Sequence, residues 1–114
     1  MESYLIGRKW KTELRHIDNF PVLSFDLELA RWKGNEDLHK FITENINQFE
    51  PSFPIKLTQD DIEKIIEALT IRPRTIYGQE GIVSQSKIDL EKFIKAKDWL
   101  TFSFPYGSVL YDVF

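Results

Sequence analysis

The sequence predicts a single α+β domain spanning residues 1–114, in which a small, mostly antiparallel sheet is packed by three or four helices. Three observations predict this class. Apolar residues recur at helical spacing in the middle of the chain, they alternate at strand spacing near both ends, and 114 residues suffice for one hydrophobic core. Apolar residues make up 42% of the chain and charged residues 29%, which is typical of a globular protein.

The N-terminal third is expected to form a strand followed by a short helix. The strand starts at Tyr4 and runs toward Trp10. After a turn at Phe20–Pro21, Ser24 or Asp26 can cap a short helix that continues to Trp32. Gly34 would end this helix, because glycine readily adopts the left-handed conformation of a helix terminus.

The middle third is expected to hold two helices separated by a short strand at 55–57. Asn35 is a favourable N-cap for the first helix, whose apolar positions are Leu38, Phe41, Ile42 and Ile46. Thr58 and Asp61 have the spacing of a capping box at the start of the second helix. Its apolar stripe follows the i, i+3, i+4, i+7 pattern through Ile62, Ile65, Ile66 and Leu69.

The C-terminal third is expected to begin with an irregular segment over residues 71–86. Ser86 would cap the last helix with Asp89 at the reciprocal position, and the apolar face would extend over residues 90–100. Residues 101–104 and 109–114 alternate as strands on either side of a turn at 105–108, which predicts a hairpin.

The charge is uneven along the chain. The net charge is −3, and the block 35–70 carries eight acids against three lysines, a net charge of −5. This balance argues against binding duplex nucleic acid through the overall electrostatic field. There is no cysteine, no apolar run of membrane-spanning length and no signal-peptide pattern, so we expect no membrane association and a cytoplasmic location.

No catalytic motif stands out. The chain lacks cysteine, a Gly-x-Ser-x-Gly elbow and the glycine-rich loops that cradle phosphates, so we expect a non-enzymatic protein without a cofactor. A metal site is not expected either, because His16, Asp18 and His39 have no ligand-spacing signature.

Two sets of residues are candidates for binding. Arg72, Arg74 and Tyr77 could hold a small anion such as a nucleotide, since arginines grip phosphates and an aromatic ring stacks on a base. The alternative is that these arginines only solubilise a turn. Trp32, Tyr106 and the pair Asp60–Asp61 are candidates for contacting a partner protein, while a core position for Trp32 and helix capping for the two acids are the alternatives. An exposed strand edge near the C-terminus could also pair with a second copy in a homodimer.

One stretch resembles a known motif. Residues 29–41 read LARWKGNEDLHKF, and Trp32 with Leu38-His39 are its distinctive residues. The stretch resembles the pattern ELAYWRKxxxLHxWM of a family of small phage and bacterial proteins of unknown function. The resemblance continues through the acidic-capped helix at 57–66 and the later helix and aromatic segment, roughly from residue 23 to 108. Lys33 and Gly34 depart from the family's Arg-Lys.

The resemblance implies a phage or mobile-element origin and carries no reaction with it. We therefore expect an accessory protein that binds a host protein, with inhibition of a host defence system, as anti-CRISPR proteins do, as the expected role. Sequestration of a nucleotide or other small anion is one alternative. A toxin-neutralising immunity protein is another.

Overall fold

The computed structural model describes residues 2–10, 24–46, 53–78 and 82–114. Within these residues the chain forms a four-stranded antiparallel sheet in the order β2-β1-β4-β3 together with four helices. The strands are β1 (Glu2–Trp10), β2 (Ser24–Lys33), β3 (Ile55–Leu57) and β4 (Gly107–Val113). The helices are α1 (Glu36–Asn45), α2 (Gln59–Ile71), α3 (Arg74–Tyr77) and α4 (Ile82–Ser103). The predicted α+β class is confirmed.

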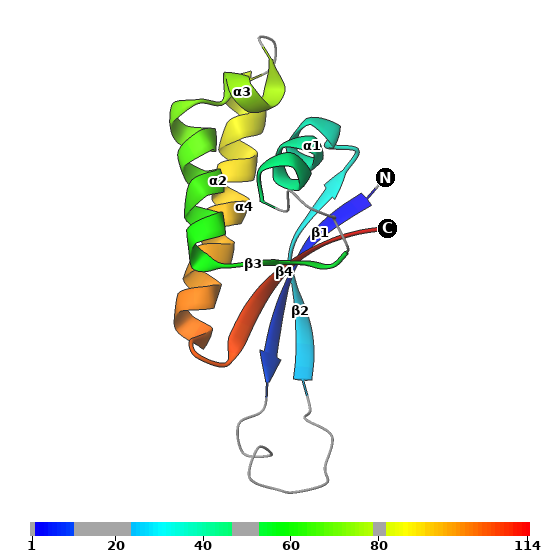
Figure 1. The fold of residues 1–114 in the computed structure, drawn as a ribbon, viewed down its shortest axis with the longest axis vertical. Coiled ribbons are helices and arrows are strands. Elements are labelled where there is room, and N and C mark those ends of the chain that lie inside the picture. The colour runs from blue at the N-terminus through cyan, green and yellow to red at the C-terminus, as the bar shows by residue number, and fades with distance from the viewer. Residues whose placement is uncertain (1, 11–23, 47–52, 79–81) are drawn as a thin grey trace, which may run out of the picture.

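The first and last strands form the centre of the sheet (Figure 1). The backbones of Glu2 and Phe114 exchange hydrogen bonds of 3.2 and 2.8 Å, so the two ends of the described chain lie side by side. Figure 1 shows α2 and α4 running together along the same side of the sheet, with α1 beyond the upper end of β2. The sheet therefore presents one face to the helices, and none of the helices formed by the described residues covers the opposite face, which we call the outer face.

The hydrophobic core lies between the helices and the sheet. Leu5, Val109 and Tyr111 are buried on the helix-facing side, where they pack with Phe93 of α4 and Ile65 of α2. Burying each such side chain contributes about 1.5–3 kcal/mol to stability relative to leaving it exposed. The core unites both ends of the chain with its middle third.

The predicted helix starts in the middle third are confirmed. The Asn35 side chain accepts a hydrogen bond from the Leu38 backbone N–H at 3.3 Å, at the start of α1. Thr58 and Asp61 form the reciprocal capping box of α2, with distances of 3.1 and 3.0 Å. Gly34 does adopt a positive φ of 72°, although it follows a strand and not a helix.

The helix predicted from residue 24 or 26 to Trp32 is wrong, because these residues form β2. Their pairing with β1 provides a backbone hydrogen-bond ladder that a short isolated helix could not match. The register shifts between Leu5 and Ile6, which is the mark of a β-bulge. The extra residue on β2 interrupts the strict alternation that would have indicated a strand.

The predicted boundaries of the last helix are also wrong. Ser86 and Asp89 lie inside α4, which begins at Ile82, and the predicted strand at 101–104 is largely the last turn of this helix. No residue between Leu100 and Pro105 interrupts a helix, so α4 continues until the proline approaches. The hairpin is therefore absent from the described residues, and β4 pairs with β1 and β3 instead. Four residues expected to be irregular form α3.

The predicted turn at Phe20–Pro21 and the candidate ligands His16 and Asp18 lie outside the described residues. None of the helices in the described part of the chain is long and apolar enough to cross a membrane.

Candidate functional site

A buried carboxylate connects four elements of the fold. Asp89 on α4 has 0% of its surface exposed. Its oxygens accept hydrogen bonds from Trp32 Nε1 at 2.7 Å, Asn35 Nδ2 at 2.9 Å and Gln85 Nε2 at 3.0 Å, and also from the Tyr77 hydroxyl. These donors belong to β2, the N-cap of α1, α4 itself and α3.

The donors explain how a carboxylate can occupy this position. Moving an isolated charge out of water is very costly unless hydrogen bonds compensate for the lost solvation. Burial, together with the hydrogen bond to Asp89, raises the pKa of Tyr77 well above its ordinary value, so this hydroxyl stays a donor at physiological pH. Because Asp89 is fully buried and engaged on both oxygens, we assign it the role of holding these elements together.

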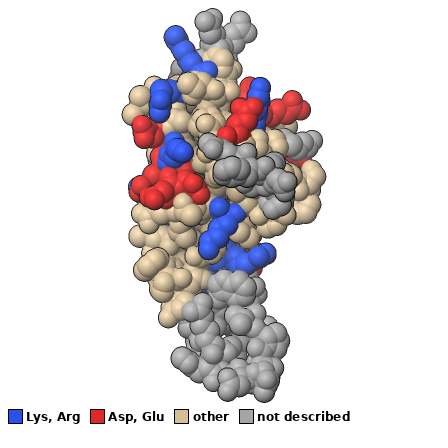
Figure 2. Space-filling model, in the orientation of Figure 1, with Lys and Arg blue, Asp and Glu red and all other residues tan. Residues whose placement is uncertain are grey.

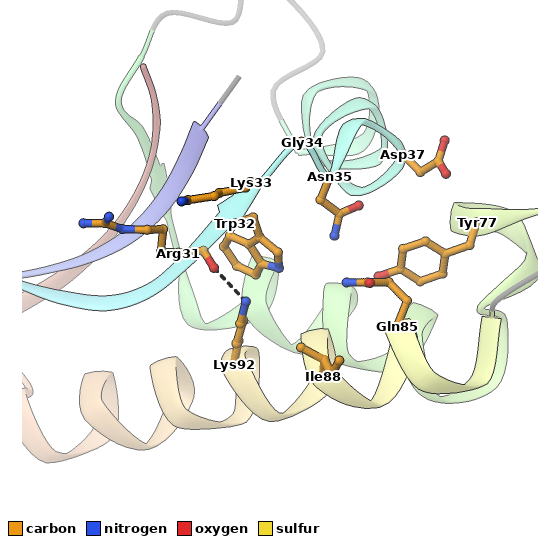
Figure 3. A pocket seen from close by; sticks show the side chains of 10 residues that line it. All are labelled: Arg31, Trp32, Lys33, Gly34, Asn35, Asp37, Tyr77, Gln85, Ile88 and Lys92. Atoms are coloured by element: carbon orange, nitrogen blue, oxygen red, sulfur yellow. Dashed lines mark hydrogen bonds between the residues drawn. The ribbon is translucent and has the colours of Figure 1, made fainter.

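An open hollow of about 460 Å³ lies beside this cluster (Figure 3). Trp32, Asn35, Tyr77, Gln85 and three cationic side chains are part of its lining. Lys92 reaches across it and donates to the Arg31 carbonyl oxygen at 2.7 Å, with its Nζ 4.7 Å from the centre of the Trp32 ring. Figure 3 shows the side chains of Arg31 and Lys33 extending away from Lys92. The cations therefore do not converge on one point where an anion could sit.

The residues predicted to bind a small anion are not brought together. Tyr77 lines the hollow beside Asp89, whereas Arg72 lines a separate hollow of about 220 Å³ between α1 and α2. The Arg72 guanidinium lies 3.8 Å from the Glu67 carboxylate, and Arg74 is exposed on α3. Within the described part of the chain, Arg72 and Tyr77 thus line two different hollows.

His39 is the described residue best suited to acid–base chemistry. Its Nδ1 lies 2.8 Å from the Tyr111 hydroxyl, and its ring stacks on Phe53 with centroids 5.7 Å apart. Burial lowers the pKa of His39 and raises that of Tyr111, so both groups are held neutral near pH 7. Within the described residues no group of three or more histidines and acids is placed to hold a metal ion.

The residues predicted to contact a partner have different positions. Trp32 is only 3% exposed and lies in the core, so the interpretation of Trp32 as a surface anchor is corrected. Asp60 and Asp61 lie in the first turn of α2, where Asp61 acts as a cap and Asp60 is exposed. Tyr106 is half-buried in the turn between α4 and β4.

Two strongly exposed apolar side chains lie where α4 ends, and two more lie at the start of β2. Phe102 and Phe104 are 84% and 78% exposed, and Phe25 and Leu27 on β2 are 49% and 48% exposed. We call Phe25, Leu27, Phe102 and Phe104 the aromatic surface. In Figure 2 the lower left of the molecule, where α4 ends in Figure 1, shows neither acidic nor basic side chains below the charged groups. Apolar side chains clustered in water typically mark an interaction surface.

The path of α4 across the sheet explains why this surface is uncovered. In the middle of α4, Lys92 touches the backbone of β2, but farther along Trp99 packs against Gly7 of β1 and Gly107 of β4. The helix therefore crosses the sheet diagonally and leaves the beginning of β2 behind. Lys9 of β1 connects the two groups of apolar side chains. Its Nζ lies 5.9 Å from the centre of the Phe102 ring, and its strand partner on β2 is Phe25.

An acidic helix start adjoins the same end of α4. Lys97 of α4 forms an ion pair of 3.4 Å with Glu63 of α2, which places the first turns of α2 next to the last turns of α4. Asp60 lies on the first turn of α2 and precedes Glu63 by three residues. The aromatic surface is therefore bordered on one side by carboxylates.

Sequence reasoning missed Phe102 and Phe104 as surface residues because it placed them in a strand. The signal that could have found them is the density of aromatic residues from Trp99 to Tyr106, which exceeds what one helix face can bury. No protein-family model, curated protein or solved structure matches this chain, so the functional argument rests on the residues and geometry described above.

Proposed function

We propose that this chain is a non-enzymatic protein that acts by binding a partner protein through the aromatic surface. The observation that carries the proposal is the exposure of Phe102 and Phe104, at 84% and 78%. Moving such a side chain from water into a partner's pocket contributes about 1.5–3 kcal/mol. Phe102 lies in the last turn of the 22-residue helix α4 and Phe104 directly follows the helix, so the backbone that carries both rings is held by regular structure and loses little conformational entropy on binding.

The surroundings of this surface indicate what kind of partner would fit. Asp60 and Glu63 border it on the α2 side, and both side chains are exposed. A partner with an apolar pocket and a basic rim would complement both features, because rim charges steer association and exclude wrong partners. Of the two acids predicted from the sequence as partner contacts, Asp60 keeps this role in the proposal, and Glu63 takes the place of the capping residue Asp61. The phenylalanines replace Trp32 as anchors.

The biological setting is proposed from the motif resemblance. A phage or mobile-element protein that occupies a surface of a host protein can inhibit a host defence system without any catalytic group, as anti-CRISPR proteins do. A toxin-neutralising immunity protein would use the same kind of surface against a different partner. The identity of the captured protein distinguishes these two roles.

A pull-down with matched variants tests the proposal. The tagged chain, the double variant Phe102→Ser/Phe104→Ser and the control Ile71→Ser would be incubated with bacterial lysate, and bound proteins identified by mass spectrometry. Ile71 is a suitable control because it is 68% exposed at the far end of α2. We expect the chain and the control to retain a stoichiometric partner that the double variant loses, since two aromatic anchors together are worth roughly 4 kcal/mol or more.

The proposal is wrong if no protein is retained, or if the double variant and the control retain the same partner equally. In the first case, native mass spectrometry of the purified chain would test the small-anion alternative, because a bound nucleotide would appear as a discrete increase in mass.

A further inference from the structure

The backbone of β2 has an open edge. β2 is an outer strand of the sheet and pairs only with β1 among the described residues. The backbone of Glu2 in β1 exchanges two hydrogen bonds with Phe114, at the end of β4. In an antiparallel sheet, successive residues of a central strand bond alternately to the strand on one side and to the strand on the other. Every second residue of β1, counted from Glu2, therefore bonds toward β4. The residues of β2 opposite them, which include Asp26 and Glu28, point their N–H and C=O groups away from the sheet.

Only the upper part of this edge is closed. Arg31 is another residue whose backbone points outward, and Lys92 of α4 donates to its carbonyl oxygen at 2.7 Å. The Lys92 ammonium group therefore occupies the carbonyl oxygen that an N–H of a further strand would need. The diagonal path of α4 carries the helix away from residues 24–28, and Figure 1 shows no helix beside this lower part of β2. Among the residues that the structure describes, the open edge is therefore confined to residues 24–28.

The side chains of this segment are exposed on both faces of the sheet. Phe25 and Leu27 point to the helix-facing side, where their partners on β1 are Lys9 and Gly7, and each is about half exposed. Asp26 and Glu28 alternate with them on the outer face and are also exposed. A strand with two uncovered faces and an unpaired backbone has the features of a site for strand addition.

The charges on the outer face favour a basic partner strand. Asp26 is held by Arg8 at 2.9 and 3.1 Å from the β1 side, and Glu28 by Arg31 at 2.8 and 3.0 Å. An ionised carboxylate has about four lone-pair sites, so each acid can accept a further donor from its open side. A strand added beside β2 would place every second side chain opposite Asp26 or Glu28, where lysine or arginine is favoured.

We infer that residues 24–28 of β2 bind an extended segment of the partner protein as an added antiparallel strand, and that this segment alternates apolar with basic side chains. Its apolar residues would lie over Phe25 and Leu27, and its basic residues beside Asp26 and Glu28. This inference rests on the proposed function, because it specifies how the partner is held next to the phenylalanines of α4.

Binding of a synthetic peptide tests the inference on the intact chain. The probe is a nine-residue peptide of alternating valine and lysine, followed by fluorescence anisotropy at low ionic strength. Two comparison peptides are used. In the first, glutamate replaces every lysine of the probe. The second has the same composition as the probe, but its valines form one block and its lysines form another. We expect both comparison peptides to bind at least about tenfold more weakly, because one breaks the charge match and the other breaks the alternation.

Amide hydrogen exchange locates the peptide. At saturation we expect the amides of Asp26 and Glu28 to exchange roughly tenfold more slowly, because their N–H groups point to the open edge. The amides of Phe25 and Leu27 already pair with β1 and should not change. Slower exchange at other strands or helices instead, or equal affinity for the three peptides, would overturn the inference.

Substitution of one apolar contact provides a matched test. Leu27→Ser should weaken binding of the valine–lysine peptide about fivefold or more, whereas Ile94→Ser, at a position 42% exposed on α4, should leave it unchanged. Urea unfolding of both variants shows whether either has lost its fold. If Leu27→Ser is folded and binds the peptide normally, the inference is wrong.

A second copy of the chain is the competing occupant. If the amides of Asp26 and Glu28 are already protected in concentrated protein without peptide, and the chain sediments as a dimer, then the edge belongs to a homodimer and the inference fails. The proposed function can fail separately. A partner that is lost on substituting Phe102 and Phe104 but bound by Leu27→Ser with the affinity of the unsubstituted chain would support the function and exclude strand addition.

Discussion

At the scale of single residues, Asp89 is the most completely buried polar side chain in the described part of the chain. Its carboxylate accepts hydrogen bonds from donors at three other places in the sequence. Of these donors, Tyr77 is the nearest to Asp89 in sequence and Trp32 is the farthest. It also lies on the buried face of α4, four residues before Phe93 and seven before Ala96. An acid that shares the helical spacing of buried apolar residues indicates from the sequence that its carboxylate is buried and hydrogen-bonded. The sequence does not indicate which residues donate these hydrogen bonds.

Replacing Asp89 should therefore be severe. We predict that Asp89→Ala lowers the free energy of unfolding by about 3 kcal/mol or more, because several buried donors lose their acceptor at once. Urea denaturation followed by circular dichroism measures the loss. Asp98→Ala, an exposed position on the same helix, should change stability by less than about 0.5 kcal/mol. Similar values for both variants would show that the cluster is not stabilising.

His39 should make stability depend on pH. Burial lowers its pKa in the folded state below the ordinary value of 6.5, so the unfolded chain binds a proton at His39 more readily than the folded chain does. The contribution of neutral His39 to the free energy of unfolding is complete above pH 6.5 and decreases as the pH falls below this value. We predict that the stability advantage of the chain over His39→Gln is largest near pH 8 and shrinks by pH 5. An advantage that grows on acidification would contradict the burial argument.

At the scale of elements, the helices of the middle third could be predicted because their signals are local. Thr58 and Asp61 lie three residues apart, and the apolar stripe from Ile62 to Leu69 repeats within two turns. β2 could not be predicted, because its stability comes from β1 and its bulge disturbs the alternation. The end of α4 was missed for another reason: Phe102 and Phe104 alternate like strand residues, yet neither is buried.

The packing of α4 on the sheet depends on Gly7. A Cβ atom at this position would lie 2.8 Å from the Trp99 ring, which is closer than van der Waals contact allows. We predict that Gly7→Ala destabilises the chain by about 1–3 kcal/mol, the usual cost of overpacking. Calorimetry of Gly7→Ala, Trp99→Leu and the double variant provides the check. The double variant should be more stable than the sum of the single effects implies, and strict additivity would mean that the two residues do not clash.

At the scale of the whole molecule, the fold separates stability from the proposed binding. The Asp89 cluster lies at one end of α4, among β2, α1 and α3, and the aromatic surface lies at the other end. The sequence predicted that aromatic and acidic residues would contact a partner, and the acids Asp60 and Asp61 were found on the predicted helix. Which aromatic residues are exposed could not be predicted, because exposure depends on the diagonal crossing of α4.

This separation predicts that the exposed phenylalanines contribute little to folding. We predict that Phe102→Ser changes the free energy of unfolding by less than about 0.5 kcal/mol, because 84% of its side chain is already in water. Phe93→Ser is the matched comparison on the same helix, and its full burial should make the loss about 3 kcal/mol or more. Thermal unfolding of both variants provides the measurement. A large loss in Phe102→Ser would assign that ring to the core.

The most direct test of the partner-binding surface is hydrogen–deuterium exchange of the chain with and without its captured partner. We predict slower exchange at the end of α4 and at the amides of Asp26 and Glu28 in β2, with α3 and the C-terminal half of α2 unchanged. Protection confined to α1, α3 and the hollow beside Asp89, with the end of α4 exchanging as in the free chain, would contradict this prediction.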